Sequence, residues 1–94
     1  MALLTDEEID RRLAEHGDWQ RGEEGSIVRE LTFPDFEAAI AFVNRVAEKA
    51  EAANHHPDIL IHGWNKLRLT LSSHSEGGLT DADFRLASEI DGLA

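Results

Sequence analysis

The stretch Asp35–Pro57, with the sequence DFEAAIAFVNRVAEKAEAANHHP, decides the fold because it predicts one long helix that stops abruptly. Its apolar residues recur at the i, i+3, i+4, i+7 spacing of one helix face: Phe36, Ala39, Ile40, Val43, Val46, Ala47 and Ala50. Pro34 and Asp35 open the helix, which runs to about Ala53 and spans roughly 27 Å, enough to cover a small sheet. The closing proline forces the residue before it into extended backbone and ends the helix.

Upstream of the long helix, the pattern predicts one helix followed by two strands. The first helix covers Leu3–Glu15, where Thr5 and Glu8 have the spacing of a capping box. Strands follow at Asp18–Arg21 and Ser26–Phe33, joined by a Gly-Glu-Glu-Gly turn. In the second strand an arginine interrupts the apolar row, so the predicted hairpin rests on the turn as much as on alternation.

Downstream, two more strands and a last helix are predicted. The strands cover Asp58–His62 and Lys66–Ser73 around a turn at Gly63, and the second alternates leucine with polar residues at period two. A Gly-Gly loop then leads to a helix over Thr80–Leu93. Asp83 fits the third position of that helix, where its carboxylate would return a capping hydrogen bond.

The order helix, two strands, helix, two strands, helix predicts an α+β fold. Hairpins imply antiparallel pairing, and the apolar helix faces must be buried against one side of the sheet. We therefore expect a four-stranded antiparallel sheet with three helices packed on one face. The length of 94 residues predicts one domain spanning residues 1–94. So small a chain buries a limited share of its surface, and oligomerisation would supplement its stability.

Composition and charge narrow the classes of function. The net charge of −10 opposes binding to nucleic-acid phosphates or anionic lipid, although an acidic excess also serves simply to keep a small protein in solution. There is no apolar run long enough to span a membrane, and the first residues do not read as a signal peptide. The absence of cysteine fits a reducing cytoplasm and excludes disulfides and thiolate metal sites.

Histidines are the candidate chemical groups, since four of the five lie between His55 and His74. The fifth, His16, is expected to be exposed near the end of the first helix. Adjacent histidines in extended backbone point to opposite sides, and no HExxH motif is present, so a metal site is not expected. Imidazole can instead exchange protons near neutral pH. Each residue also has an ordinary structural explanation: surface or capping for the histidines, hairpin packing for Trp64, helix termination for Pro57 and helix capping for Asp83.

Taken together, these residues resemble the signature of the pterin-4a-carbinolamine dehydratase family. The spacing is Glu51-x3-His55-His56-Pro57-x6-Trp64-x9-His74-x8-Asp83. Two segments are also similar to the family: the N-H-H-P core at Asn54–Pro57 and the S-H-x-x-G-G-L-T segment at Ser73–Thr80. The resemblance covers nearly the whole chain.

The resemblance implies the removal of water from 4a-hydroxytetrahydrobiopterin, a product of aromatic amino-acid hydroxylases, to give quinonoid dihydropterin. It implies a catalytic set of His55, His56 and His74, in which the first and last exchange protons and His56 mainly binds and orients the pterin. It also implies supporting roles for the remaining signature residues: Glu51, Pro57, Trp64 and Asp83. The resemblance implies no metal and no cofactor. It does imply a homodimer or a homotetramer. The alternative is a non-enzymatic role, as a transcriptional dimerisation cofactor or an enzyme assembly factor.

Overall fold

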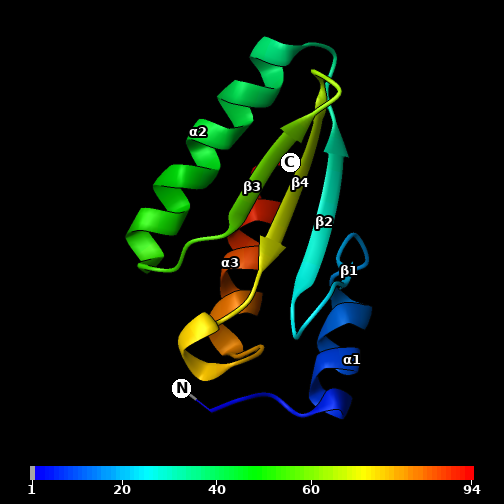
Figure 1. Ribbon diagram of the computed structural model, residues 1–94, viewed down its shortest axis with the longest axis vertical. Helices are drawn as coiled ribbons and strands as arrows, with labels where there is room; N and C mark the ends of the chain where they lie inside the picture. The colour runs from blue at the N-terminus through cyan, green and yellow to red at the C-terminus, as the bar shows by residue number, and fades with distance from the viewer. Residues whose placement is uncertain (1) are drawn as a thin grey trace.

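Helices and strands alternate along the computed structural model, which describes residues 2–94. Within these residues the order is α1 (Asp6–Glu15), β1 (Gln20–Arg21), β2 (Ile27–Thr32), α2 (Phe36–Ala53), β3 (Asp58–His62), β4 (Lys66–Leu71), the 3-10 helix η1 (His74–Glu76) and α3 (Asp81–Asp91). All strand pairs are antiparallel, and the sheet order is β1-β2-β4-β3 (Figure 1). The predicted α+β fold is confirmed.

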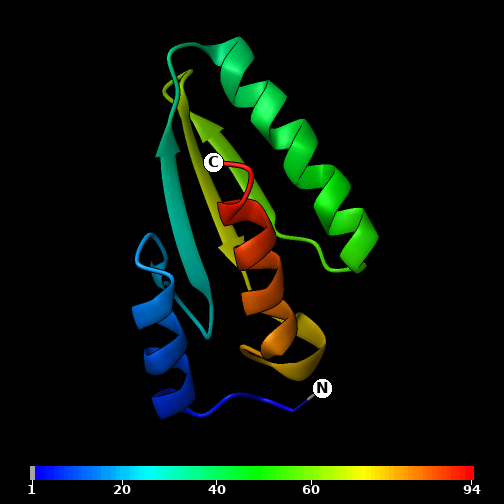
Figure 2. The ribbon, with the colours of Figure 1, turned by 180° about the vertical axis from the view of Figure 1, so that it is seen from behind.

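One face of the sheet forms the core, and all three helices contribute to it. Side chains that alternate along β2 and β4 are fully buried on this face: Ile27, Leu67, Leu69 and Leu71. The same cluster takes Ile9 from α1, Phe42 from α2 and Phe84 from α3. Figure 2 shows α3 crossing in front of the sheet, whereas the opposite face in Figure 1 carries no helix. Period-two alternation therefore gives the sheet one covered and one open side.

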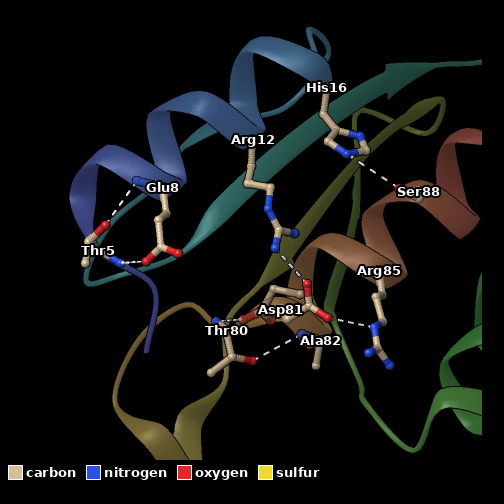
Figure 3. Close-up of polar contacts among 10 residues, drawn as sticks. Thr5, Glu8, Arg12, His16, Thr80, Asp81, Ala82, Arg85 and Ser88 are labelled. Carbon is tan, nitrogen blue, oxygen red and sulfur yellow. Dashed lines mark hydrogen bonds and ion pairs between the residues drawn. The ribbon is translucent and has the colours of Figure 1, made fainter. Parts of the chain in front are cut away.

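The first helix begins later than predicted, although its cap is as expected. Thr5 has extended backbone, and its hydroxyl accepts the Glu8 backbone N–H while Glu8 accepts the Thr5 backbone N–H (Figure 3). The bond from the Thr5 backbone N–H, followed by the Thr5 hydroxyl, holds the pKa of Glu8 below its usual value. The helix starts at Asp6 rather than Leu3 because the residue that caps a helix is itself not helical.

A polar cluster centred on Asp91 holds three side chains: Arg29, Trp19 and His16. The guanidinium of Arg29, which interrupts the apolar row of β2, lies 2.6 Å from Asp91 Oδ1, and Trp19 Nε1 donates to the same oxygen at 2.8 Å. His16 was expected to be exposed, but its Nδ1 lies 3.2 Å from Asp91 Oδ2 and its ring is mostly buried. Because a buried cation needs a counter-charge, α3 supplies a carboxylate to the covered face.

The strands are shorter than predicted: β2, expected over 26–33, loses one residue at each end, and two other strand ends lose two residues each. The first strand, expected over 18–21, keeps only Gln20–Arg21 because Trp19 turns into the core. The last, expected over 66–73, ends at Leu71. Beyond it, η1 forms a turn that the sequence pattern did not predict.

The buried side of α2 also differs from the predicted one. Its buried residues are Ala39, Phe42, Val46 and Ala50. Phe36 and Ile40, which were expected to face the core, are exposed. Figure 1 shows α2 beside the β3 edge of the sheet rather than over its middle. Part of the broad apolar surface of α2 therefore lies outside the core.

Candidate active site

The first wall of the candidate site is the link between α2 and β3. Asn54 ends α2 in the left-handed region (φ 51°), and its backbone N–H bonds to the carbonyls of the last helical turn. His55 and His56 follow, and Pro57 leads directly into β3 at Asp58. The two histidines are therefore fixed at a sharp exit from the helix, as the Asn-His-His-Pro sequence predicts.

The opposite wall is the loop between β4 and α3. Ser73 and Gly78 pair as an isolated bridge, with the Ser73 N–H 2.9 Å from the Gly78 carbonyl. Between them η1 carries His74, and Gly77 closes the turn with a positive φ of 78° that glycine adopts without strain. The loop returns the chain to Thr80, the N-cap of α3.

Between these two walls lies an open cavity of about 390 Å³, and all three candidate histidines line it. The lining residues come from both walls and from the start of α3: Asn54, His55, His56, Ser72, Ser73, His74, Ser75, Glu76, Thr80 and Ala82. The volume is within the range of small-molecule sites. Ser72 and His74 also border a larger hollow of about 780 Å³ on the open face of the sheet.

His55 is held by a buried carboxylate. Its Nε2 lies 2.6 Å from Asp83 Oδ1, and Asp83 is fully buried in the first turn of α3. The other carboxylate oxygen, Oδ2, accepts the Ser73 hydroxyl and the Thr80 backbone N–H, each at 2.9 Å. Asp83 thus forms the predicted capping box of α3 and contacts a site histidine at the same time.

The other two histidines are held more loosely. His56 Nε2 pairs with Glu51 in the last turn of α2, and both side chains are largely exposed. His74 is exposed, and its Nε2 lies 3.5 Å from the Ser72 hydroxyl, at the outer limit of a hydrogen bond. The site therefore combines one imidazole that is bonded to a buried carboxylate with two that are exposed.

None of the four predicted supporting residues lines the cavity: Glu51 and Asp83 bond to its histidines, whereas Pro57 and Trp64 lie elsewhere. Pro57 is adjacent to the cavity lining in the chain and sets the path into β3. Trp64 lies in the turn between β3 and β4, at the other end of these strands, with a positive φ of 60° and an exposed fraction of 62%. Five residues of β3 at about 3.3 Å each separate it from the histidines of its own chain.

Ser73 and Thr80 were not among the predicted site residues. A signal for Ser73 is present in the sequence, because the inward row Leu67, Leu69, Leu71 continues at period two to this serine. A polar residue at an inward position needs a buried partner, which is Asp83. The alternation along the strand therefore predicts that Ser73 has a buried polar partner. It does not predict which residue that partner is, because this depends on where α3 packs.

Among residues 2–94, no group of three or more histidine and carboxylate side chains is arranged to hold a metal ion. Over the same residues no helix has the combined length and apolarity that a bilayer crossing requires.

Comparison with known proteins identifies the chain's relatives. The sequence model described as "Pterin 4 alpha carbinolamine dehydratase" matches residues 2–93. A protein of Mycobacterium sp. (strain KMS), named as a candidate pterin-4-alpha-carbinolamine dehydratase, is 48% identical over 97% of this chain and 95% of its own. One from Chloroflexus aggregans with the same name is 50% identical over 97% and 96%.

Two solved structures are also similar. A transcriptional coactivator/pterin dehydratase from Brucella melitensis superposes with a TM-score of 0.93 at 32% identity, over 99% of each chain. A pterin dehydratase-like protein identified as a RuBisCO assembly factor in the alpha-carboxysome superposes with a TM-score of 0.69 at 25% identity, over 84% of this chain and 92% of its own. The fold is therefore used by proteins with more than one described role.

Proposed function

The chain belongs to the pterin 4 alpha carbinolamine dehydratase family, and we propose that it removes water from 4a-hydroxytetrahydrobiopterin to give quinonoid dihydropterin. The observation that carries this proposal is the convergence of His55, His56 and His74 on one cavity from two separate elements. Groups that converge from different elements on a concave surface are typical of an active site rather than of histidines placed for capping.

The proposed reaction needs two proton movements. The 4a-hydroxyl must be protonated so that it leaves as water, and a proton must leave a ring nitrogen. His55 and His74 lie on opposite walls of the cavity, so each is assigned to one face of the flat pterin. Proton donation neutralises the leaving hydroxide, and this step requires no metal ion.

The remaining residues are assigned to binding and orientation. His56, beside Glu51 at the rim, binds and orients the pterin. Asp83 positions His55, and Pro57 fixes the direction in which the histidine pair leaves α2. These assignments follow the contacts of each side chain: a buried carboxylate on His55, an exposed one on His56.

A stopped-flow assay of carbinolamine dehydration tests the proposal. We expect the purified chain to accelerate the reaction without added metal and after treatment with a chelator. The His55→Ala/His74→Ala double variant is the control for background dehydration. A wild-type rate equal to that of the double variant would overturn the proposal, and loss of activity on chelation with recovery on adding zinc would overturn the metal-free mechanism.

A homo-oligomer is part of the proposal and is supported by the free edge of β3. This strand reads Asp-Ile-Leu-Ile-His, and Ile59 and Leu60 are exposed. Antiparallel pairing of two copies about Leu60 would place Asp58 opposite His62 of the second copy. The same pairing would bring Trp64 of the second copy to the level of His56, which gives this tryptophan a route to the site.

A cytoplasmic location and a functional link to an aromatic amino-acid hydroxylase complete the proposal, because the substrate is the product of such an enzyme. The second candidate is a non-enzymatic protein-binding role. The exposed apolar residues Phe36 and Ile40 on α2 favour it, since a protein partner would cover them. Activity of the wild-type chain above the double-variant control separates the first candidate from the second.

A further inference from the structure

Three buried polar side chains connect the end of β4 to the first turn of α3. Ser73, Thr80 and Asp83 are all nearly inaccessible, and each is hydrogen-bonded to the others. Ser73 was not among the residues that the sequence pattern or the family resemblance assigned to the site. Within residues 2–94 its hydroxyl is hydrogen-bonded to Thr80 and Asp83 and not to a histidine, so its connection to His55 runs through Asp83.

The hydrogen bonds of this group have a defined direction. Thr80 Oγ1 accepts the Ala82 backbone N–H at 3.3 Å, so its own hydrogen is available to Ser73 Oγ at 2.8 Å. The Ser73 hydroxyl in turn donates to Asp83 Oδ2 at 2.9 Å, and the Thr80 backbone N–H donates to the same oxygen. With two donors aimed at it, Oδ2 is held as an acceptor.

This direction determines how His55 can be protonated. Because Asp83 Oδ2 is occupied by donors, Oδ1 is the oxygen left to accept the His55 Nε2–H at 2.6 Å. The bond that one ring nitrogen makes fixes the role of the other. Among residues 2–94, His55 Nδ1 has no hydrogen-bond partner, and the ring lines the cavity.

We propose that Ser73 is a positioning residue: with Thr80 it orients Asp83 so that His55 keeps a proton on Nε2 and uses Nδ1 to exchange protons with the substrate. The role of Nδ1 rests on the proposed dehydration, whereas the location of the Nε2 proton does not. Ser73 acts on His55 through Asp83, and removing the Ser73 hydroxyl releases Oδ2 and lets the carboxylate rotate.

Nitrogen-15 NMR of the histidine side chains in the whole protein tests the first part. At a pH where His55 is neutral, we expect the wild-type spectrum to show Nε2 protonated and Nδ1 unprotonated. A His55→Gln variant assigns the signals among the five histidines. Protonation of Nδ1 instead of Nε2 in the wild type would overturn the proposal, and this measurement needs no change to the buried group.

Kinetics and NMR of Ser73→Ala test the second part. We expect a mixture of the two neutral forms of His55 and a roughly tenfold to hundredfold lower kcat with KM little changed, the loss typical of a misplaced catalytic group. Ser26→Ala is the matched control, since Ser26 is similarly buried (7% exposed against 6%) and its hydroxyl donates to the Glu23 carbonyl rather than to Asp83. It should leave the His55 signals and kcat unchanged.

Two outcomes separate this proposal from the proposed function. If the chain has no dehydratase activity but His55 carries its proton on Nε2 in a Ser73-dependent way, the positioning role stands and the function is wrong. If Ser73→Ala keeps wild-type signals and kcat, the positioning role is wrong. Should Ser73→Ala not fold, Ser73→Cys keeps a weaker donor of similar size, for which we expect a smaller change in the same direction. A wild-type spectrum and rate in that variant would reject the positioning role.

Discussion

Two neighbouring histidines of this chain are each paired with a carboxylate, but the two pairs lie in opposite surroundings. His55 pairs with Asp83, which is fully buried and receives two further hydrogen bonds. His56 pairs with Glu51, whose side chain is 76% exposed and whose carboxylate accepts no other hydrogen bond within residues 2–94. The two pairs therefore differ in the burial of the carboxylate and in the number of its donors, and the buried pair is the one expected to hold its imidazole more firmly.

The largest expected effect separates the histidines by role. His55→Ala and His74→Ala should each lower kcat by roughly 10²–10⁴, the usual loss of a general acid, and each should spare one stereoisomer of the 4a-hydroxyl. His56→Ala should mainly raise KM, because it removes binding shared by the ground and transition states. Single-turnover kinetics with both stereoisomers measures this. A lost kcat in His56→Ala, with the other two variants like wild type, would reverse the assignment.

The second prediction compares the two carboxylates. Asp83→Asn leaves a buried group with poorly matched partners and should lower the free energy of unfolding by about 1–3 kcal/mol. Glu51→Gln breaks an exposed pair and should cost about 0–1 kcal/mol. Urea denaturation of both variants at one pH gives the two values. Equal losses would contradict the contrast between the pairs.

Much of this contrast was predictable from the chain alone. Thr80 and Asp83 have capping-box spacing, and the Asn-His-His-Pro sequence predicts the sharp exit from α2; both features are local and both are observed. The meeting of His55 with Asp83 is not local, because it joins residues 28 apart through the packing of α3. Family resemblance named both residues, but only the fold supplies the contact between them.

The predictions that were wrong also concern features that depend on non-local packing. Periodicity placed Phe36 and Ile40 toward the core, but the helix has more apolar surface than the sheet can cover, and its position over the β3 edge decides which stripe is buried. His16 was expected at the surface because its partner, Asp91, is 75 residues away in sequence. Local spacing defines elements and caps, whereas the choice of face and of distant partners depends on tertiary packing.

The third prediction concerns an oligomer in which the exposed pair of His56 and Glu51 would be covered. A second copy along β3 would begin at Asp58, two residues after His56, and would shield His56 and Glu51. Leu60→Lys puts a charge at the centre of that edge and should weaken association about tenfold or more, equivalent to ~1.4 kcal/mol. Light scattering across a dilution series measures the change. Arg68→Lys, which keeps the charge on the open sheet face, is the control, and a wild-type monomer of 10.5 kDa at micromolar concentration would exclude the oligomer.

The smallest expected effect concerns Asp81, an exposed counterpart of Asp83 in the same helical turn. Its Oδ1 lies 2.8 Å from Arg12 Nη2, and its Oδ2 lies 2.7 Å from Arg85 Nε (Figure 3). The hydrogen bond from Arg12 is the main reason that the pKa of Asp81 is below its usual value of 3.8, with Arg85 adding to it. The folded state therefore favours the ionised carboxyl.

A lowered pKa in the folded state gives stability that is complete above the unfolded value and is lost as the pH falls through the folded one. Arg12→Ala should thus lower the free energy of unfolding by about 0.2–1 kcal/mol at pH 7, the range of exposed pairs. This difference should shrink below pH 3.8 as Asp81 becomes protonated. Because Arg12 also lies over the Phe84 ring, part of its effect should not depend on pH. Urea denaturation at pH 7 and pH 3 separates the two parts, with Asp81→Asn as the control that lacks the titrating group. If the difference in free energy of unfolding between Arg12→Ala and wild type instead grew on acidification, the Arg12–Asp81 ion pair would not stabilise the fold. Of the two carboxylates in this turn, only the buried one of Asp83 would then be expected to do so.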